Sequence, residues 1–246
     1  MALQSREIGG RMCRLYSNGT PRALLVQLVS PMQEAELEGE VAQIAAAGLP
    51  FAMVAVPIVD WELELMPWAE PAVSKRPEVG TRAGETLRYI VDSLMGPQPS
   101  PGAQPSRLHA GETPAHPALP VVLGGYSLGG LFSLWAACQT DAFCAVAAGS
   151  PSLWAGDWPE YAAEHPMLAR HVYLSLGDRE ERSRNKTMAR VGDRIREEYS
   201  RLQRQLGPGS ATLRWEQGGH FADPAARMAR AFVWCLERIH DNTPSI

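Results

Sequence analysis

Cysteine, excess positive charge and long apolar runs are all scarce in this sequence of 246 residues. Its four cysteines are Cys13, Cys138, Cys144 and Cys235. They form no C-x-x-C pair, which argues against a disulfide framework or a metal site and favours a reducing, cytoplasmic location. Lys and Arg number 23 against 27 Asp and Glu, so the net charge of −4 offers no basic footprint for nucleic acid or an anionic membrane. No apolar run reaches about 18 residues, and the N-terminus lacks the apolar core of a signal peptide, so we expect no membrane segment.

The chain contains 45% hydrophobic and 20% charged residues, which is ordinary for a globular protein. Apolar runs and amphipathic stretches alternate along it, and this alternation predicts an α/β fold with a mostly parallel sheet and helices on both faces. Strands are predicted at residues 23–29, 51–56, 121–123, 143–147, 171–176 and 211–215. Helices are predicted at residues 34–47, 82–95, 131–137, 186–205 and 224–239.

Residues 96–120 contain seven prolines and three glycines, a composition that cannot pack a core. This segment is therefore predicted to be a surface loop or a linker. It could separate two domains, but the part of the chain before it supplies too few strands to stand alone. We therefore predict a single domain over residues 1–246, with a Pro/Gly-rich surface loop at 96–120.

The sharpest motif is GYSLG at residues 125–129, which matches the G-x-S-x-G pattern of a nucleophile elbow. It follows a predicted buried strand and opens a predicted helix, as this tight turn requires. Ser127 is thus the candidate nucleophile, and the amide of Leu128, at the helix N-terminus, is a candidate oxyanion donor. The alternative is a glycine-rich turn in which Ser127 only caps the helix.

A serine hydroxyl needs an adjacent base to act as a nucleophile. In enzymes with this elbow the histidine comes last, after the acid, which leaves His220 and His240 as candidates. His240 follows the last predicted helix, whereas His220 lies in a glycine-rich loop directly after a predicted strand. We therefore assign His220 as the general base; the alternative is a surface-loop histidine beside turn glycines.

The third member should follow the strand at 171–176, which ends in Gly-Asp-Arg-Glu-Glu. Spacing alone does not separate Asp178, Glu180 and Glu181, each of which could accept a hydrogen bond from the histidine. We favour Glu180, then Asp178, then Glu181, because Glu180 has room to turn back. The alternative for such a run is a solvated, helix-capping loop.

A second oxyanion amide normally comes from the loop after the first parallel strand, here Ser30, Pro31 and Met32. Pro31 has no amide hydrogen, so Ser30 and Met32 both remain open. Aromatic side chains in loops after the predicted strands suggest an aryl or acyl cleft, although these rings could simply pack the loops onto the core. The candidates for this substrate pocket are Tyr126, Trp61, Trp68 and Trp154.

Basic side chains follow the candidate acid at Arg179, Arg182, Arg184 and Lys186. They could steer an anionic substrate toward the site. The simpler interpretation is the solvated start of a helix.

Four motifs stand in order along the chain: GGYSLGGL at 124–131, GSPSLW at 149–154, LSLGDRE at 174–180 and GGHF at 218–221. Together they resemble the esterase branch of the α/β-hydrolase superfamily, which includes esterase D-like carboxylesterases, siderophore (enterochelin) esterases and mycolyltransferases. The resemblance implies an α/β-hydrolase fold without a separate cap domain and a Ser–His–acid hydrolase without cofactor or metal. The family often carries a Glu at the G-x-x-E position, which supports Glu180.

The sequence therefore predicts a serine esterase that cleaves a small-molecule carboxylic ester through an acyl-enzyme on Ser127. Acyl transfer and peptide or thioester cleavage use the same constellation and remain open. From a different class, a non-catalytic binding protein that has kept the fold is the rival. The sequence does not indicate the substrate or the oligomeric state.

Overall fold

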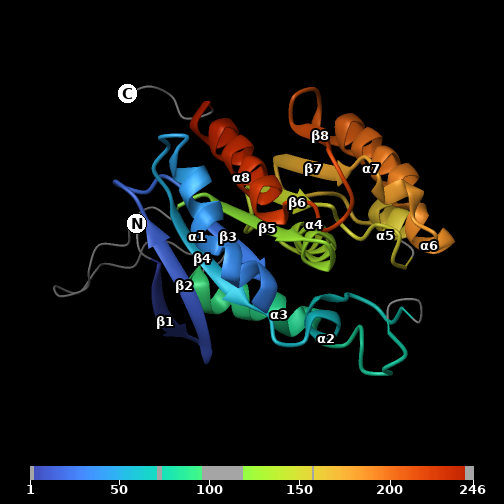
Figure 1. The fold of residues 1–246 in the computed structure, drawn as a ribbon, viewed down its shortest axis with the longest axis horizontal. Coiled ribbons are helices and arrows are strands. Elements are labelled where there is room, and N and C mark those ends of the chain that lie inside the picture. Colours follow the sequence, from blue (N-terminus) through green and yellow to red (C-terminus); the bar gives the residue numbers. More distant parts are fainter. Residues whose placement is uncertain (1–2, 71–73, 96–118, 157, 242–246) are drawn as a thin grey trace, which may run out of the picture.

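A computed structural model describes residues 3–70, 74–95, 119–156 and 158–241, so nearly all of the predicted loop at 96–120 lies outside the described residues. The described strands form one eight-stranded sheet in the order β1-β2-β4-β3-β5-β6-β7-β8 (Figure 1). The strands are β1 (Gln4–Ile8), β2 (Arg11–Ser17), β3 (Leu24–Val29), β4 (Ala52–Pro57), β5 (Val121–Tyr126), β6 (Ala145–Gly149), β7 (His171–Gly177) and β8 (Ala211–Glu216).

Strands β3 to β8 run parallel to one another, as the alternating sequence pattern predicts. β1 and β2 form an antiparallel hairpin at one edge, and β2 pairs antiparallel with β4. Gly9 and Gly10 join the hairpin with φ of 54° and 81°, the left-handed backbone that a tight two-residue turn requires. No strand is predicted here from the sequence, because β1 is exposed along most of its length and lacks an apolar alternation.

Helices cover both faces of the sheet, so the predicted α/β layering is confirmed. Figure 1 shows α1 and α8 side by side over the strands, and both helices contribute to one apolar cluster with that face. Helices α3, α4 and α7 contribute to the cluster on the opposite face. The helical segments are α1 (Pro31–Ala45), α2 (Trp61–Leu65), α3 (Ala83–Tyr89), the π-helical turn η1 (Ile90–Leu94), α4 (Leu128–Gln139), α5 (Trp158–Glu164), the 3₁₀ turn η2 (Glu180–Arg182), α6 (Lys186–Ala189), α7 (Val191–Leu206) and α8 (Pro224–Asp241).

Local capping explains where several of these helices begin. Ser30 accepts a hydrogen bond from the Gln33 amide while the Gln33 side chain accepts one from the Ser30 amide, a capping box that starts α1. Asp60 caps α2, a short helix in a segment for which the sequence predicts no helix or strand. The predicted helix at 186–205 is two helices, α6 and α7, which meet at Arg190.

The parallel strands place their following loops at one edge of the sheet. The segments after β3, β5, β6, β7 and β8 therefore converge, although they are far apart in sequence. None of the helices in the described ranges combines the length and the apolar character needed to cross a bilayer.

Candidate active site

The turn between β5 and α4 holds Ser127 in a strained backbone conformation. Ser127 has φ of 60° and ψ of −121°, a region that non-glycine residues rarely adopt, and its amide donates to the Gly149 carbonyl at 2.9 Å. A side chain at Gly125 would meet the backbone of Gly129 at 2.6 Å, so glycine is needed for α4 to approach β5. The strand–turn–helix predicted from the GYSLG motif is present.

Ser127, His220 and Glu180 form a continuous hydrogen-bonded chain. His220 Nε2 lies 3.0 Å from Ser127 Oγ, and His220 Nδ1 lies 2.7 Å from Glu180 Oε2. Because the carboxylate accepts at Nδ1, the imidazole carries its proton there and presents the Nε2 lone pair to the serine hydroxyl. The three residues come from the loops after β5, β7 and β8.

Glu180 is a buried and fully engaged carboxylate, with its side chain 6% exposed. Its Oε1 accepts from the Gly177 amide and from the Ser150 hydroxyl, each at 2.8 Å. Burial by itself would raise the pKa of Glu180, but the hydrogen bond and charge interaction with His220, with these two donors, outweigh burial and lower it. The carboxyl group is therefore held ionised at neutral pH.

The other two carboxylates of this segment lie elsewhere. Asp178, the second candidate for the acid, is exposed and accepts the Gly218 amide at 2.9 Å rather than contacting the histidine. Glu181 pairs with Arg196 at 2.8 Å. Among the three, the chain reversal through η2 brings only Glu180 to His220, so Asp178 serves to tie the β7 and β8 loops together.

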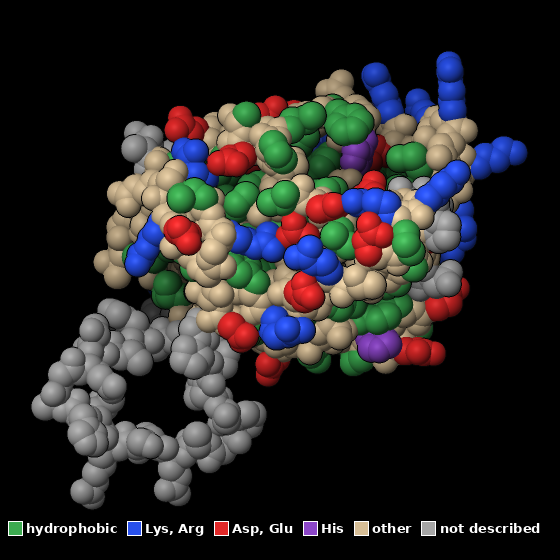
Figure 2. All heavy atoms as spheres, turned by 90° about the horizontal axis from the view of Figure 1, so that it is seen from below, with side chains coloured by type: hydrophobic (Ala, Val, Ile, Leu, Met, Phe, Trp, Pro, Cys, Tyr) green, Lys and Arg blue, Asp and Glu red, His purple; other side chains and the backbone are tan. Residues whose placement is uncertain are grey.

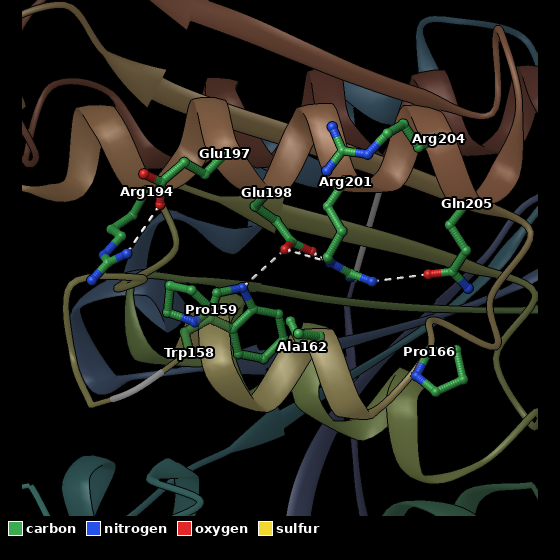
Figure 3. Close-up of a pocket in the computed structure, with 11 residues that line it drawn as sticks. Trp158, Pro159, Ala162, Pro166, Arg194, Glu197, Glu198, Arg201, Arg204 and Gln205 are labelled. Carbon is green, nitrogen blue, oxygen red and sulfur yellow. Dashed lines mark hydrogen bonds and ion pairs between the residues drawn. The ribbon is translucent and has the colours of Figure 1, made fainter.

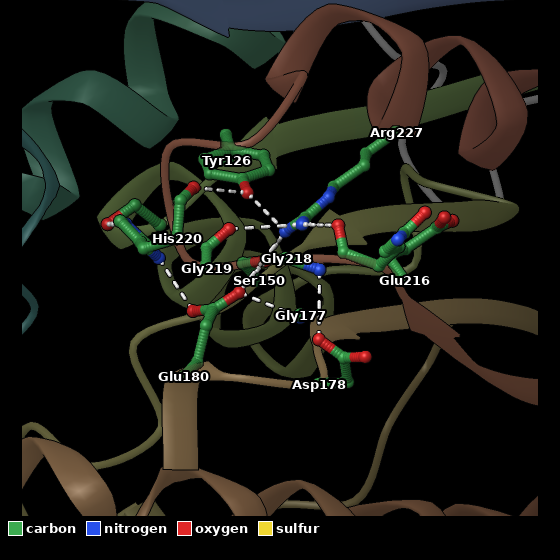
Figure 4. A network of polar contacts seen from close by, with 12 residues as sticks. Tyr126, Ser150, Gly177, Asp178, Glu180, Glu216, Gly218, Gly219, His220 and Arg227 are labelled. Carbon is green, nitrogen blue, oxygen red and sulfur yellow. Dashed lines mark hydrogen bonds and ion pairs between the residues drawn. The ribbon is translucent and has the colours of Figure 1, made fainter. Parts of the chain in front are cut away.

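Arg227 belongs to the same network, and no sequence motif predicts it (Figure 4). Its side chain is 1% exposed, and its guanidinium donates to Glu180 Oε1 at 3.2 Å and to the Tyr126 hydroxyl at 2.9 Å. The feature of the sequence that could have identified Arg227 is a charged residue on the otherwise apolar face of the last helix. Ala231 and Cys235, one and two turns further along that face, are completely buried.

Ser152 is a second residue that the sequence analysis does not identify. Its hydroxyl lies 3.2 Å from Ser127 Oγ, its amide donates to the Ser127 carbonyl at 3.1 Å, and it is 3% exposed. Since Ser127 donates its own proton to His220, the Ser152 hydroxyl is the donor within the serine pair. The GSPSLW motif contains Ser152, but the motif does not indicate that the Ser152 side chain points toward Ser127.

The two candidate oxyanion amides both lie in the first turn of a helix. Leu128 is the first residue of α4, and Met32 is the second residue of α1 and is 68% exposed. Amides in the first turn have no acceptor within the helix. The competing amide of Ser30 donates to Gln33 Oε1 at 3.0 Å and is thus already engaged.

A cavity of about 290 Å³ opens beside Ser127. One wall is apolar and consists of Trp154, Met188, Val191 and Phe221, and the Phe221 ring is 80% exposed. Ser152 and Arg179 supply polar atoms to the lining. The cavity therefore combines the Ser127 hydroxyl with space for an apolar group.

Of the four aromatic residues predicted to line a substrate pocket, Trp154 is the one that lines this cavity among the described residues. Tyr126 is 4% exposed and faces the core under α1 and α8, where its hydroxyl donates to the His220 carbonyl at 2.7 Å. Trp61 packs against Gly129 of α4. Trp68 packs against Tyr161 in a tilted arrangement, with ring centroids 5.6 Å apart. These three rings pack on neighbouring elements and do not line this cavity, and a role for them in binding substrate stays a prediction.

A larger cavity, of about 540 Å³, lies between α5 and α7 (Figure 3). Trp158 donates to Glu198 at 3.1 Å, and Arg201 pairs with the same carboxylate at 2.7 Å. Arg194 pairs with Glu197 at 3.0 Å. The charges of this cavity are largely paired with one another, and its lining supplies no nucleophile, so it is a weaker candidate for chemistry.

Positive charge gathers next to the smaller cavity. Within the described part of the chain, no ion pair engages the basic side chains of this segment, which are Arg179, Arg182, Arg184, Lys186 and Arg190. Figure 2 shows Lys and Arg side chains projecting at one corner of the molecule. The described residues contain no cluster of three or more His, Cys, Asp or Glu arranged to hold a metal ion.

No family model matches the sequence, and no curated protein matches it either. Solved structures do match. The siderophore hydrolase EstA from Aspergillus nidulans has a TM-score of 0.66 at 18% identity, over 96% of this chain and 94% of that chain. An IroE-like serine hydrolase from Shewanella oneidensis has a TM-score of 0.67 at 14% identity, over 99% of this chain and 82% of that chain.

The enterobactin esterase FES from Shigella flexneri has a TM-score of 0.62 at 16% identity, over 97% of this chain. The match covers 60% of that longer protein. At these identities the likeness establishes the fold. The chain has the α/β-hydrolase fold, as its mostly parallel sheet and the resemblance of its motifs predict.

Proposed function

We propose that this protein is a serine esterase that cleaves a small-molecule carboxylic ester through an acyl-enzyme on Ser127. The observation that carries the proposal is the hydrogen-bonded chain from Ser127 Oγ through His220 to Glu180 at a strained elbow. A nucleophile, a base and an orienting acid in this geometry have the parts needed for acyl transfer. The structural neighbours, whose names are hydrolase or esterase, lend further support.

In the proposed reaction Ser127 attacks the ester carbonyl while His220 Nε2 takes its proton. Glu180 stabilises the imidazolium and keeps the ring in the correct orientation. The Leu128 amide and the Met32 amide would hold the tetrahedral oxyanion, each contributing about 3 kcal/mol to lowering the barrier. The protonated histidine returns the proton to the leaving alcohol, and water repeats the cycle on the acyl-enzyme.

The cavity beside Ser127 supports an ester with a compact apolar group. Trp154, Met188 and Phe221 offer an apolar wall, and about 290 Å³ suits an aryl or short acyl group. The names of two structural neighbours, a siderophore hydrolase and an enterobactin esterase, indicate small-molecule substrates. This supports a small-molecule ester over a peptide as the substrate of this chain.

Labelling with a fluorophosphonate, beside hydrolysis of short p-nitrophenyl esters, tests the proposal. Wild type should label and turn over, whereas Ser127→Ala and His220→Ala should lose at least about 10⁴-fold in kcat/KM. Ser200→Ala is the matched control, because Ser200 lies exposed on α7 and its hydroxyl bonds only its own helix. A wild type that neither labels nor hydrolyses esters would contradict the proposal and favour the binding protein. Product formed on an added alcohol acceptor would identify an acyltransferase.

A further inference from the structure

We propose that Arg227 is a positioning residue that clamps the acid and the histidine loop of the triad into one rigid unit. The proposal deepens the esterase function and rests on it. Glu180 and His220 come from different loops, after β7 and β8, which Asp178 joins through the Gly218 amide without contacting the histidine. A single guanidinium from α8 lies between the two loops and contacts both (Figure 4).

One nitrogen of the guanidinium holds the acid. Arg227 Nη1 donates to Glu180 Oε1 at 3.2 Å and to Ser150 Oγ at 3.2 Å, and Ser150 itself donates to the same carboxylate oxygen. With Oε1 held in this way, Oε2 is directed toward His220 Nδ1. The arginine therefore fixes the rotation of the carboxylate about its own axis.

The other nitrogen holds the histidine loop. Arg227 Nη2 donates to the carbonyl oxygens of Gln217 at 3.2 Å and Gly219 at 3.0 Å, which flank a glycine with φ of 103°. Glycine-rich backbone has little rigidity of its own. The Tyr126 hydroxyl completes the hold, because it accepts from Arg227 and donates to the His220 carbonyl.

The burial of Arg227 shows how strongly this arrangement is constrained. A guanidinium that is 1% exposed must be paired and hydrogen-bonded to be tolerated, and here its ionic partner is the catalytic acid itself. A planar fork donates in two directions at once, which an ammonium group on a flexible stem does not reproduce. The chain thus buries an arginine where an apolar residue would complete the face of α8.

The positive charge of Arg227 also affects the pH dependence of the proposed reaction. The charged and titratable groups facing Glu180 are His220 from the β8–α8 loop, Arg227 from α8 and Tyr126 from β5, with Arg179 and Glu181 as chain neighbours. Arg227 lies on Oε1, opposite the histidine, and offsets part of the carboxylate charge. Without that positive charge, the imidazolium would be stabilised more, and the acid limb of the pH–rate profile would move to higher pH.

The test compares Arg227→Met and Arg227→Lys with wild type in the full-length protein, using a short p-nitrophenyl ester. We expect Arg227→Met to lose about 10²-fold or more in kcat with little change in KM, and to shift the acid limb of the profile to higher pH. Arg227→Lys keeps the charge but not the fork, so its kcat should fall while its acid limb stays in place. Arg230→Met is the matched control: it removes an arginine of the same helix, paired with Glu216 nearer the surface, and should leave kcat unchanged.

A spectroscopic readout separates this proposal from the esterase function. The proton on His220 Nδ1, hydrogen-bonded to Glu180, should give a strongly downfield ¹H NMR signal in wild type and in Arg230→Met. That signal should be lost or shifted in Arg227→Met, and circular dichroism establishes that the variant is folded. If Arg227→Met does not fold, Arg227→Lys and Tyr126→Phe take its place in the same measurement.

The results of these measurements distinguish failure of the positioning role of Arg227 from failure of the esterase function. An active wild type with a folded Arg227→Met of normal kcat and an unchanged signal would overturn the positioning role while leaving the esterase intact. An inactive wild type whose signal still disappears in Arg227→Met would overturn the esterase and leave the clamp standing.

Discussion

The direction of each proton in the site follows from the bonds at the acid end of the chain. Glu180 has a lowered pKa and is ionised, so Nδ1 of His220 must donate to it and Nε2 must accept. Ser127 then donates to Nε2, and its oxygen keeps lone pairs that accept from Ser152. In the proposed reaction, the Ser127 oxygen would thus receive a hydrogen bond from Ser152 as it loses its own proton.

This arrangement predicts a modest catalytic role for Ser152. In Ser152→Ala the donor to the Ser127 oxygen is lost, and we expect kcat to fall roughly fivefold with KM nearly unchanged, as suits one neutral hydrogen bond. Steady-state kinetics on a p-nitrophenyl ester measures it. Ser175→Ala is the control, since Ser175 is equally buried in β7 and its hydroxyl has no hydrogen-bond partner in the described structure. Equal rates for the two variants would show that the serine pair does not help the reaction.

At the scale of elements, the sheet brings together loops that the sequence keeps apart. The central strands could be predicted because they are nearly all apolar, and the elbow could be predicted because its motif lies within a few residues of Ser127. Which carboxylate reaches His220 depends on the turn through η2. The spacing along the sequence therefore leaves three carboxylates as candidates for the acid. The hairpin β1–β2 carries no apolar alternation, and the partners of Arg227 lie up to 101 residues away in sequence. Such long-range contacts have no local pattern from which to predict them.

The contact between α1 and β3 contains a buried carboxyl group away from the active site. Glu40 is 2% exposed, and its Oε2 accepts from Gln27 Nε2 at 3.1 Å. Glu40 Oε1 and the amide oxygen of Gln27 are buried without a hydrogen-bond partner in the described structure. Burial raises the pKa of Glu40 to about 8. Protonation therefore suits the folded state, because it removes the buried charge.

We expect this group to make the protein less stable as pH rises. The unfolded chain releases the Glu40 proton near the ordinary value of 4.5, whereas the folded protein keeps it until about 8. The folded state thus binds more protons between these values, and the free energy of unfolding falls across that window as pH rises. Glu40→Gln removes the titration, so at pH 8 its Tm should exceed that of wild type by at least about 2 °C.

Thermal unfolding at pH 4 to 9 measures this effect. The advantage of Glu40→Gln should be small at pH 4, grow through the window and level off above it. Glu38→Gln is the control on the same helix, because that side chain is 71% exposed. A constant difference at every pH would contradict the raised pKa and point to packing alone.

Across the whole molecule, charge is distributed unevenly. The net charge is −4, yet the segment from Arg179 to Arg190 presents basic side chains that form no ion pair within the described residues. Arg179 lines the cavity beside Ser127. Basic side chains therefore lie beside the candidate site on a protein that is acidic overall, and such an arrangement would attract an anionic ester.

Salt dependence decides between steering and a merely solvated helix start. We expect kcat/KM for an aryl ester that carries a carboxylate to fall between about 10 mM and 150 mM salt, because the screening length shortens from about 30 Å to about 8 Å. A neutral ester of the same size should show little change. Arg182→Gln with Arg184→Gln should flatten the slope for the anionic ester. The matched pair, Arg6→Gln with Arg22→Gln, removes the same charge from the edge strand β1 and from the segment just before β3, and should keep the slope. If both esters give the same slope in wild type, these cations are solvated charges that do not guide the substrate.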